Sequence, residues 1–107
     1  MLDAARRAHD FAVGSGRDGL APGEVPTLGL IKCIEIIGEA ANHVSDATTS
    51  CLPGIPWRSI VAMRHRTIHG YDDVNLDIVW DTATRALPGL IAALQIALEN
   101  WPPSAND

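Results

Sequence analysis

The residues best suited to chemistry lie in one stretch of the chain, from Met63 to Tyr71. This stretch contains two arginines, two histidines and the only tyrosine of the protein. No acidic residue occurs between Pro56 and Tyr71, although the 107-residue chain has a formal net charge of -5. Arginine binds phosphate through a planar fork of donors, and histidine exchanges protons near neutral pH. The stretch is therefore the candidate site of any chemistry that the chain performs.

Residue spacing alone leaves three interpretations open. His65 and His69 are four residues apart, a spacing found in metal sites on helices, but the pair lacks the glutamate of the H-E-x-x-H motif and a third ligand. In the second interpretation the cations have only a structural role, because positive charge near the C-terminus of a helix interacts favourably with the helix dipole. The third interpretation is RNA cleavage, which needs a base, an acid and positive charge at phosphorus. One Arg/His set supplies half of these groups, so two sets facing across a symmetric dimer would complete the site.

Composition places the chain in the class of small globular domains with an aliphatic core. It is 47% apolar but has only one Phe and one Tyr. The negative charge argues against broad nonspecific binding of nucleic acid, though it allows a local basic cleft. Cys33 and Cys51 form neither a metal-binding spacing nor a disulfide framework. No segment reaches 18 uninterrupted apolar residues. We expect one domain at residues 1–101, a disordered tail at 102–107, no membrane association and a cytoplasmic location.

The apolar periodicity predicts helices throughout and no strands, which indicates an all-α bundle of four or five helices. The predicted helices cover residues 2–13, 27–44, 57–68, 75–87 and 90–101. Thr27 and either Asp73 or Asn75 are the expected N-caps, and Gly70 is expected to end the third helix. Residues 17–26 and 45–53 are predicted to be loops. Pro88-Gly89 is predicted to break or kink the last helical stretch.

The predicted second helix has more apolar surface than one core requires. Its buried seam consists of Leu30, Ile34, Ile37, Ala41 and Val44. Leu28 and Ile36 lie away from that seam, which favours contact with a second subunit.

Two glutamates and a glycine on this helix also bear on packing and on the site. Glu35 and Glu39 are four residues apart, a repulsive pair unless a cation lies opposite, and Glu39 is the better candidate for a supporting polar role. Gly38 in mid-helix indicates close approach of another helix.

Four sequence blocks, in order and at matching intervals, resemble the HepT-like family of HEPN toxins. The blocks are Glu35–Ala41 (EIIGEAA), Ile55–Ile60 (IPWRSI), Met63–Tyr71 (MRHRTIHGY) and Val74–Trp80 (VNLDIVW). The resemblance covers the chain from Leu2 to about Leu98. It implies a HEPN-type helical homodimer whose paired motifs line a cleft that cleaves RNA without a metal ion or other cofactor.

The family's R-x(4–6)-H motif with its following H-x-Y falls on Arg64, His69 and Tyr71. The resemblance implies that Arg64 and His69 are catalytic, with His65, Arg66 and Glu39 as auxiliary candidates. It further implies a type VII-like toxin–antitoxin system in which a minimal nucleotidyltransferase, the antitoxin, transfers AMP to Tyr71 and silences the toxin.

This chain departs from the family motif at one position, because His65 follows the motif arginine where asparagine is usual. Histidine is bulkier and can carry charge, so it changes the cleft next to Arg64. A non-catalytic function therefore stays open, in which the domain binds a nucleotide or substrate as the partner of a nucleotidyltransferase. Arg64, His65 and Arg66 would then hold a nucleotide phosphate, and His69 would not transfer protons.

Overall fold

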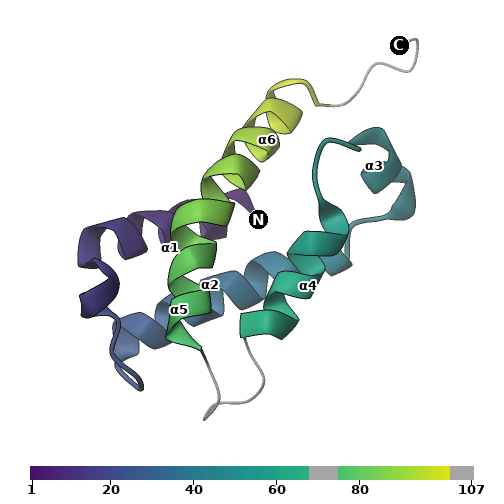
Figure 1. Cartoon of the computed structure of the whole chain (residues 1–107). Coiled ribbons are helices and arrows are strands. Elements are labelled where there is room, and N and C mark those ends of the chain that lie inside the picture. Colours follow the sequence, from purple (N-terminus) through teal and green to yellow (C-terminus); the bar gives the residue numbers. More distant parts are fainter. Residues whose placement is uncertain (68–74, 102–107) are drawn as a thin grey trace.

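The fold is a bundle of helices, with no strand in the part of the chain that is described (Figure 1). The structure is a computed structural model, and it describes residues 1–67 and 75–101, without the side chains of residues 64–67. The helices are α1 (Leu2–Ser15), α2 (Val25–Asn42), α3 (Asp46–Cys51), α4 (Trp57–Thr67), α5 (Leu76–Asp81) and α6 (Leu87–Glu99), with a 3₁₀ turn at Arg17–Gly19 and a π-helical stretch at Thr82–Ala86. Since α5, the π stretch and α6 follow one another without a break, they form one helical arm. The prediction of an all-α bundle of four or five helices is confirmed.

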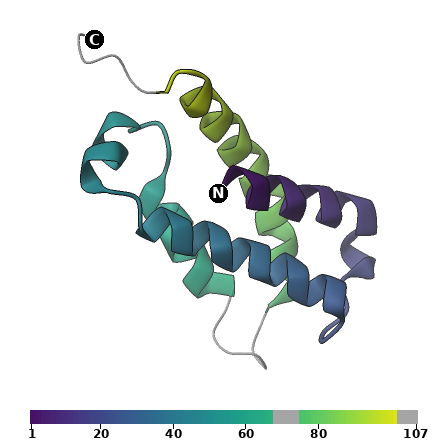
Figure 2. The ribbon, with the colours of Figure 1, turned by 180° about the vertical axis from the view of Figure 1, so that it is seen from behind.

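Helix α2 lies at the centre of the bundle and contacts α4 on one side and α1 on the other. Figure 2 shows α2 and α1 from behind, with the helical arm crossing beyond them. Helix α1 also packs against α6 and the π stretch, and α4 contacts α5. The buried cluster therefore takes residues from every helix except the short α3.

The predicted apolar seam of α2 faces this cluster. Leu30, Ile34 and Ile37 are at most 2% exposed, and Ala41 is 4% exposed. Burial of each large aliphatic side chain contributes roughly 1.5–3 kcal/mol relative to leaving it in water. The seam was predicted correctly except at its end, because α2 ends at Asn42 and Val44 beyond it is only half-buried.

The start of α2 differs from the prediction. The helix begins at Val25 with Pro26 in its first turn, so Thr27 is not its N-cap. Proline suits this position because its missing N–H would have no partner within the helix. Thr27 is instead 1% exposed, and its hydroxyl accepts a hydrogen bond from the Ala21 N–H at 3.2 Å. This threonine joins the connection after α1 to the first turn of α2.

The loop predicted at residues 45–53 is wrong, because helix α3 occupies most of it. Ser45 caps α3, its hydroxyl accepting a hydrogen bond from the Thr48 N–H at 3.2 Å. The segment has no apolar period, and its Asp, Thr and Ser residues have weak helix propensity. The cap at Ser45 therefore outweighs intrinsic preference over this short stretch.

Of the break or kink predicted at Pro88-Gly89, the break does not occur, because the chain stays helical through both residues. The irregularity lies just before them, where the Leu87 N–H bonds to the Thr82 carbonyl, five residues back. A proline in a regular α-helix lacks an N–H and clashes with the carbonyl four residues earlier. The wider π turn ahead of Pro88 relieves that conflict, so the chain continues as a helix.

Asn75 caps α5 as expected, accepting hydrogen bonds from the N–H groups of Asp77 and Ile78. The expected roles of Gly70 and Asp73, and the tail at 102–107, lie outside the described residues. Across the described helices, none has the length and apolar character needed to cross a membrane.

Candidate functional site

Helix α4 carries the beginning of the basic stretch, and its backbone is helical through Thr67. The chain is described again from Asn75, which caps α5. Helices α4 and α5 contact each other, so the two ends of the intervening segment are held by one packed unit. The side chains of Arg64, His65 and Arg66, together with all of His69 and Tyr71, lie outside the described residues.

A salt bridge ties the start of α5 to the turn that follows α1. The Arg17 Nε donates to the Asp77 Oδ1 at 2.8 Å, and a terminal nitrogen of the same guanidinium lies 2.7 Å from that oxygen. The two side chains are 38% and 80% exposed, so solvent screens the pair. The contact links α5 to a segment sixty positions earlier in the sequence. Asp77, which makes the contact, lies two residues after Asn75, where the described chain begins again.

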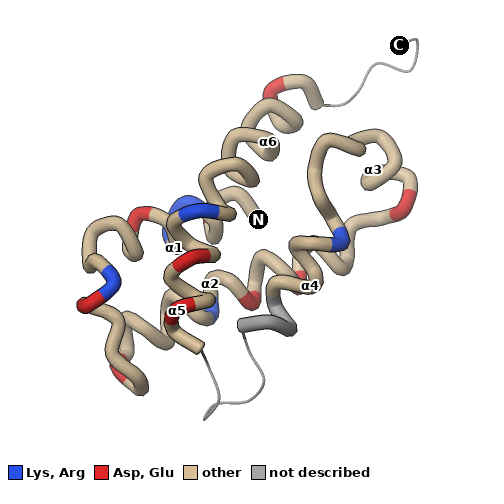
Figure 3. Tube along the Cα trace, viewed as in Figure 1, with Lys and Arg blue, Asp and Glu red and all other residues tan. Residues whose placement is uncertain are grey.

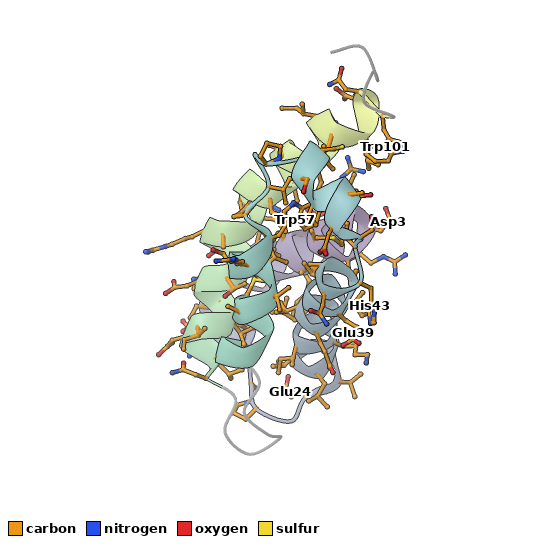
Figure 4. The ribbon with its side chains drawn as sticks, turned by 90° about the vertical axis from the view of Figure 1, so that its right-hand side faces the viewer. Asp3, Glu24, Glu39, His43, Trp57 and Trp101 are labelled. Carbon is orange, nitrogen blue, oxygen red and sulfur yellow. The ribbon has the colours of Figure 1, made fainter. Side chains whose placement is uncertain are left out.

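Glu39, the auxiliary candidate on α2, has a neighbour that sequence reasoning did not identify. Its Oε1 lies 3.3 Å from the His43 Nε2, one helical turn further along. Figure 4 shows both side chains projecting from the same side of α2. A carboxylate beside an imidazole can accept a hydrogen bond from a ring N–H and orient the ring. The signal for this pair was present in the sequence as a four-residue spacing on one helix face.

The two glutamates of α2 each have a cationic or titratable neighbour on their own helix. Lys32 Nζ lies 3.8 Å from Glu35 Oε2, while His43 accompanies Glu39. These partners offset the repulsion expected between two glutamates one turn apart. Together with Ile36 and Ala40, the four side chains line a groove of about 300 Å³ on the outer side of α2.

A larger hollow of about 840 Å³ lies at the other end of α4. It is formed by the end of α2, by α3 and by the first turns of α4, where Trp57, Arg58 and Ser59 line it. Sequence reasoning did not identify this hollow, because its walls come from three separate segments whose packing no local pattern encodes. In the described residues there is no group of three or more side chains placed to hold a metal ion.

Comparison with known proteins places this architecture in a family. The sequence profile titled ribonuclease HepT-like matches residues 1–97. The chain belongs to the ribonuclease HepT-like family. The match includes α4, the start of α5 and the segment between them, so the family pattern spans the basic stretch and the helices that carry it.

Individual relatives agree with the family assignment. The chain is 36% identical over 61 residues to a Thermococcus cleftensis protein named "Probable ribonuclease HepT", covering 57% of this chain and 56% of that protein. It is 35% identical over 66 residues to a candidate RNase of Caldanaerobacter subterraneus, covering 62% and 59% of the two chains. The matches thus span little more than half the length of these relatives. A longer match, 27% identical over 96 residues, covers 90% of this chain and 88% of a candidate RNase of Methanocaldococcus jannaschii. No solved structure gives a significant match.

Proposed function

We propose that this HepT-like protein is a metal-independent endoribonuclease that acts as a homodimer and is the toxin of a type VII-like toxin–antitoxin system. The observation that carries the proposal is the family match across residues 1–97. The presence of Arg64, His69 and Tyr71 at the motif positions supports it.

In the proposed reaction, the 2′-hydroxyl of RNA attacks the adjacent phosphorus. A phosphorus–oxygen bond forms, and the bond to the 5′-oxygen of the next nucleotide breaks. The attacking hydroxyl loses its proton to a base, and the leaving oxygen receives a proton from an acid. His69 is the proton-transfer group, and Arg64 stabilises the negative charge that builds up at phosphorus. The products are a 2′,3′-cyclic phosphate and a free 5′-hydroxyl.

One chain supplies a single His69, while the reaction needs both a base and an acid, so the site is proposed to be shared by two copies. The exposed apolar residues on α2 support this assembly, since Leu28 is 46% and Ile36 is 43% exposed. A two-fold dimer places the same face of both chains in one interface. Light scattering at micromolar concentration should give the mass of two chains, and a stable monomer would contradict the composite site.

The first experiment is RNA cleavage in the presence of EDTA, with total RNA as substrate. The wild-type protein should cleave, and both Arg64→Ala and His69→Ala should abolish cleavage while circular dichroism shows an unchanged helix content. Arg7→Ala is the matched control, since Arg7 lies on α1 and is exposed. Absence of cleavage by the wild-type protein would support the alternative, a non-catalytic nucleotide-binding partner of a nucleotidyltransferase.

Regulation is proposed to occur at Tyr71, through AMP transferred by a cognate minimal nucleotidyltransferase. A bulky anion two residues from His69 would exclude the substrate phosphate by its size and charge. Because Tyr71 is the only tyrosine, intact-mass measurement gives a direct test. Tyr71→Phe should retain cleavage, gain no AMP and remain active beside the antitoxin. An AMP-sized increment on Tyr71→Phe would place the modification on another residue.

A further inference from the structure

The hollow at the start of α4 has polar groups on a lining that is otherwise apolar. They include the Asn42 amide, the hydroxyls of Thr49, Ser50 and Ser59, and the guanidinium of Arg58. Its volume of about 840 Å³ is within the range of pockets that hold small organic ligands, roughly 300–1,000 Å³. A nucleotide-sized group therefore fits, and the lining offers several hydrogen-bond donors to it.

Arg58 is the group in the hollow that attracts an anion. In the part of the chain that the structure describes, the exposed Arg58 has neither a hydrogen bond nor an ion pair. The sequence from Ala47 to Tyr71 contains no acidic residue, in a protein of net charge -5. Figure 3 shows that the described acids lie on α1, α2, α3, α5 and α6 and in the connection between α1 and α2, and that none lies on α4. Asp46 is the one acid among the described residues that line the hollow, so it opposes the attraction of Arg58 for an anion.

An aromatic ring lies beside this cation. Trp57 is half-buried and lines the hollow, and its Nε1 donates to the Leu52 carbonyl at 3.1 Å (Figure 4). That hydrogen bond holds the indole in place without using its face. Stacking of a base on an aromatic face contributes roughly 1–3 kcal/mol and tolerates any base, which is typical of proteins that bind single strands.

The hollow is connected with the basic stretch along α4. Arg58, Ser59 and Ala62 are all exposed, and positions 58, 62 and 66 recur at a four-residue spacing. Positions four residues apart lie on one side of a helix. The rise from position 58 to position 66 is about 12 Å. A strand lying along this side of α4 would therefore run from the hollow to the proposed catalytic motif.

We propose that this hollow is a second RNA subsite, in which Arg58 binds a backbone phosphate away from the bond that is cleaved. A base stacks on Trp57, and the neighbouring hydroxyls and amide bind sugar or phosphate oxygens. The inference rests on the proposed function for its ligand, single-stranded RNA. It adds a binding residue that touches the strand at a distance from the reacting phosphate.

The test measures binding separately from cleavage. The full-length protein is titrated into a fluorescently labelled single-stranded oligoribonucleotide, and anisotropy gives the dissociation constant at several salt concentrations. A 2′-O-methyl group at every position keeps the RNA probe from being cleaved, because no 2′-hydroxyl is left to attack, while the probe retains its phosphates. The logarithm of affinity falls as the logarithm of salt concentration rises, and loss of one phosphate contact should make this negative slope shallower by about 0.7. Arg58→Ala should show this change with roughly tenfold weaker binding at low salt.

Three further variants make the result specific to the hollow. Arg58→Lys should keep the wild-type salt slope, because it retains the charge. Asp46→Asn should bind RNA more tightly, since it removes the opposing carboxylate. Arg7→Ala, which removes the same charge from an exposed position on α1, should match the wild-type slope.

The outcomes separate this inference from the proposed function. A protein that binds the probe through Arg58 but cleaves no RNA would support the subsite and contradict the nuclease. An Arg58→Ala variant with wild-type affinity and salt slope would overturn the subsite, whether or not the protein cleaves RNA. So would dissociation of a dimer by Arg58→Ala with no change in salt slope, because the hollow would then belong to the interface between copies.

Discussion

Two isoleucines on α2 offer a matched test of which side of this helix is buried. Ile34 is fully buried and Ile36 is 43% exposed, and both lie in the middle of the same helix. Replacement by alanine removes three carbon groups in either case. At about 0.8 kcal/mol for each buried group, Ile34→Ala loses about 2.4 kcal/mol of transfer free energy. The cavity left in the core raises the expected destabilisation to about 3–4 kcal/mol.

For Ile36→Ala the same reasoning gives a much smaller number. Only about half of the side chain leaves water on folding, and alanine has the better helix propensity by about 0.4 kcal/mol. No closed cavity forms, so the free energy of unfolding should fall by about 1 kcal/mol or less. Urea titrations followed by circular dichroism measure both values, at a protein concentration where light scattering shows monomers.

Repeating the titrations at higher concentration connects this pair to the proposed dimer. If a second copy covers the outer side of α2, Ile36→Ala should become more destabilising as concentration rises, because dimerisation adds to the stability of the wild type. The change at Ile34 should depend little on concentration. Equal losses for the two variants in the monomer would refute the assignment of the buried side of α2.

Three further predictions concern α5 and the motif. Asn75→Ala should lower the free energy of unfolding by about 1 kcal/mol in a urea titration, and Asn75→Asp should retain most of it, because either oxygen can cap the helix. A double-mutant cycle on Arg17→Ala and Asp77→Ala should give a coupling of roughly 0.2–1 kcal/mol that shrinks in high salt; a salt-independent coupling would contradict a screened ion pair. His65→Asn, which restores the residue usual in the family, should keep or raise the rate of RNA cleavage, and loss of cleavage would give His65 an essential role.

The parts of the fold that the sequence predicts are those controlled by local pattern. The α2 seam follows from a helical period, and Asn75 follows from the chemistry of capping. Thr27 was assigned wrongly because its residue type suits a cap, whereas its hydroxyl bonds to Ala21 in the preceding turn. The helix does not break at Pro88, because proline breaks a regular α-helix but follows a π turn without conflict. In both cases the surrounding structure overrides the preference of a single residue.

For the candidate site, the sequence predicts which residues match the family motif, and the structure adds what surrounds them. Glu39 was predicted as an auxiliary group, and the structure shows that His43, four residues further along, lies beside it. The hollow at Arg58, the proposed subsite, depends on α2, α3 and α4 meeting in space, and α3 was itself predicted to be a loop. Contacts between distant segments of this kind are set by packing, which a single sequence encodes only indirectly.

The π-helical stretch fixes the rotational phase between the two halves of the helical arm. Val79 on α5 and Leu90 and Leu94 on α6 all face the core, on either side of residues that make a wider turn. A π turn takes up one extra residue within a helix, so α5 and α6 keep the phase that they would have in a regular α-helix one residue shorter. Inserting one more residue within Thr82–Ala86 would exceed what this turn takes up and would rotate α6 by about 100° relative to α5. Leu90 and Leu94 would then turn away from the core. A one-residue insertion here should therefore be far more damaging than a one-residue deletion, which leaves the phase of the two helices intact.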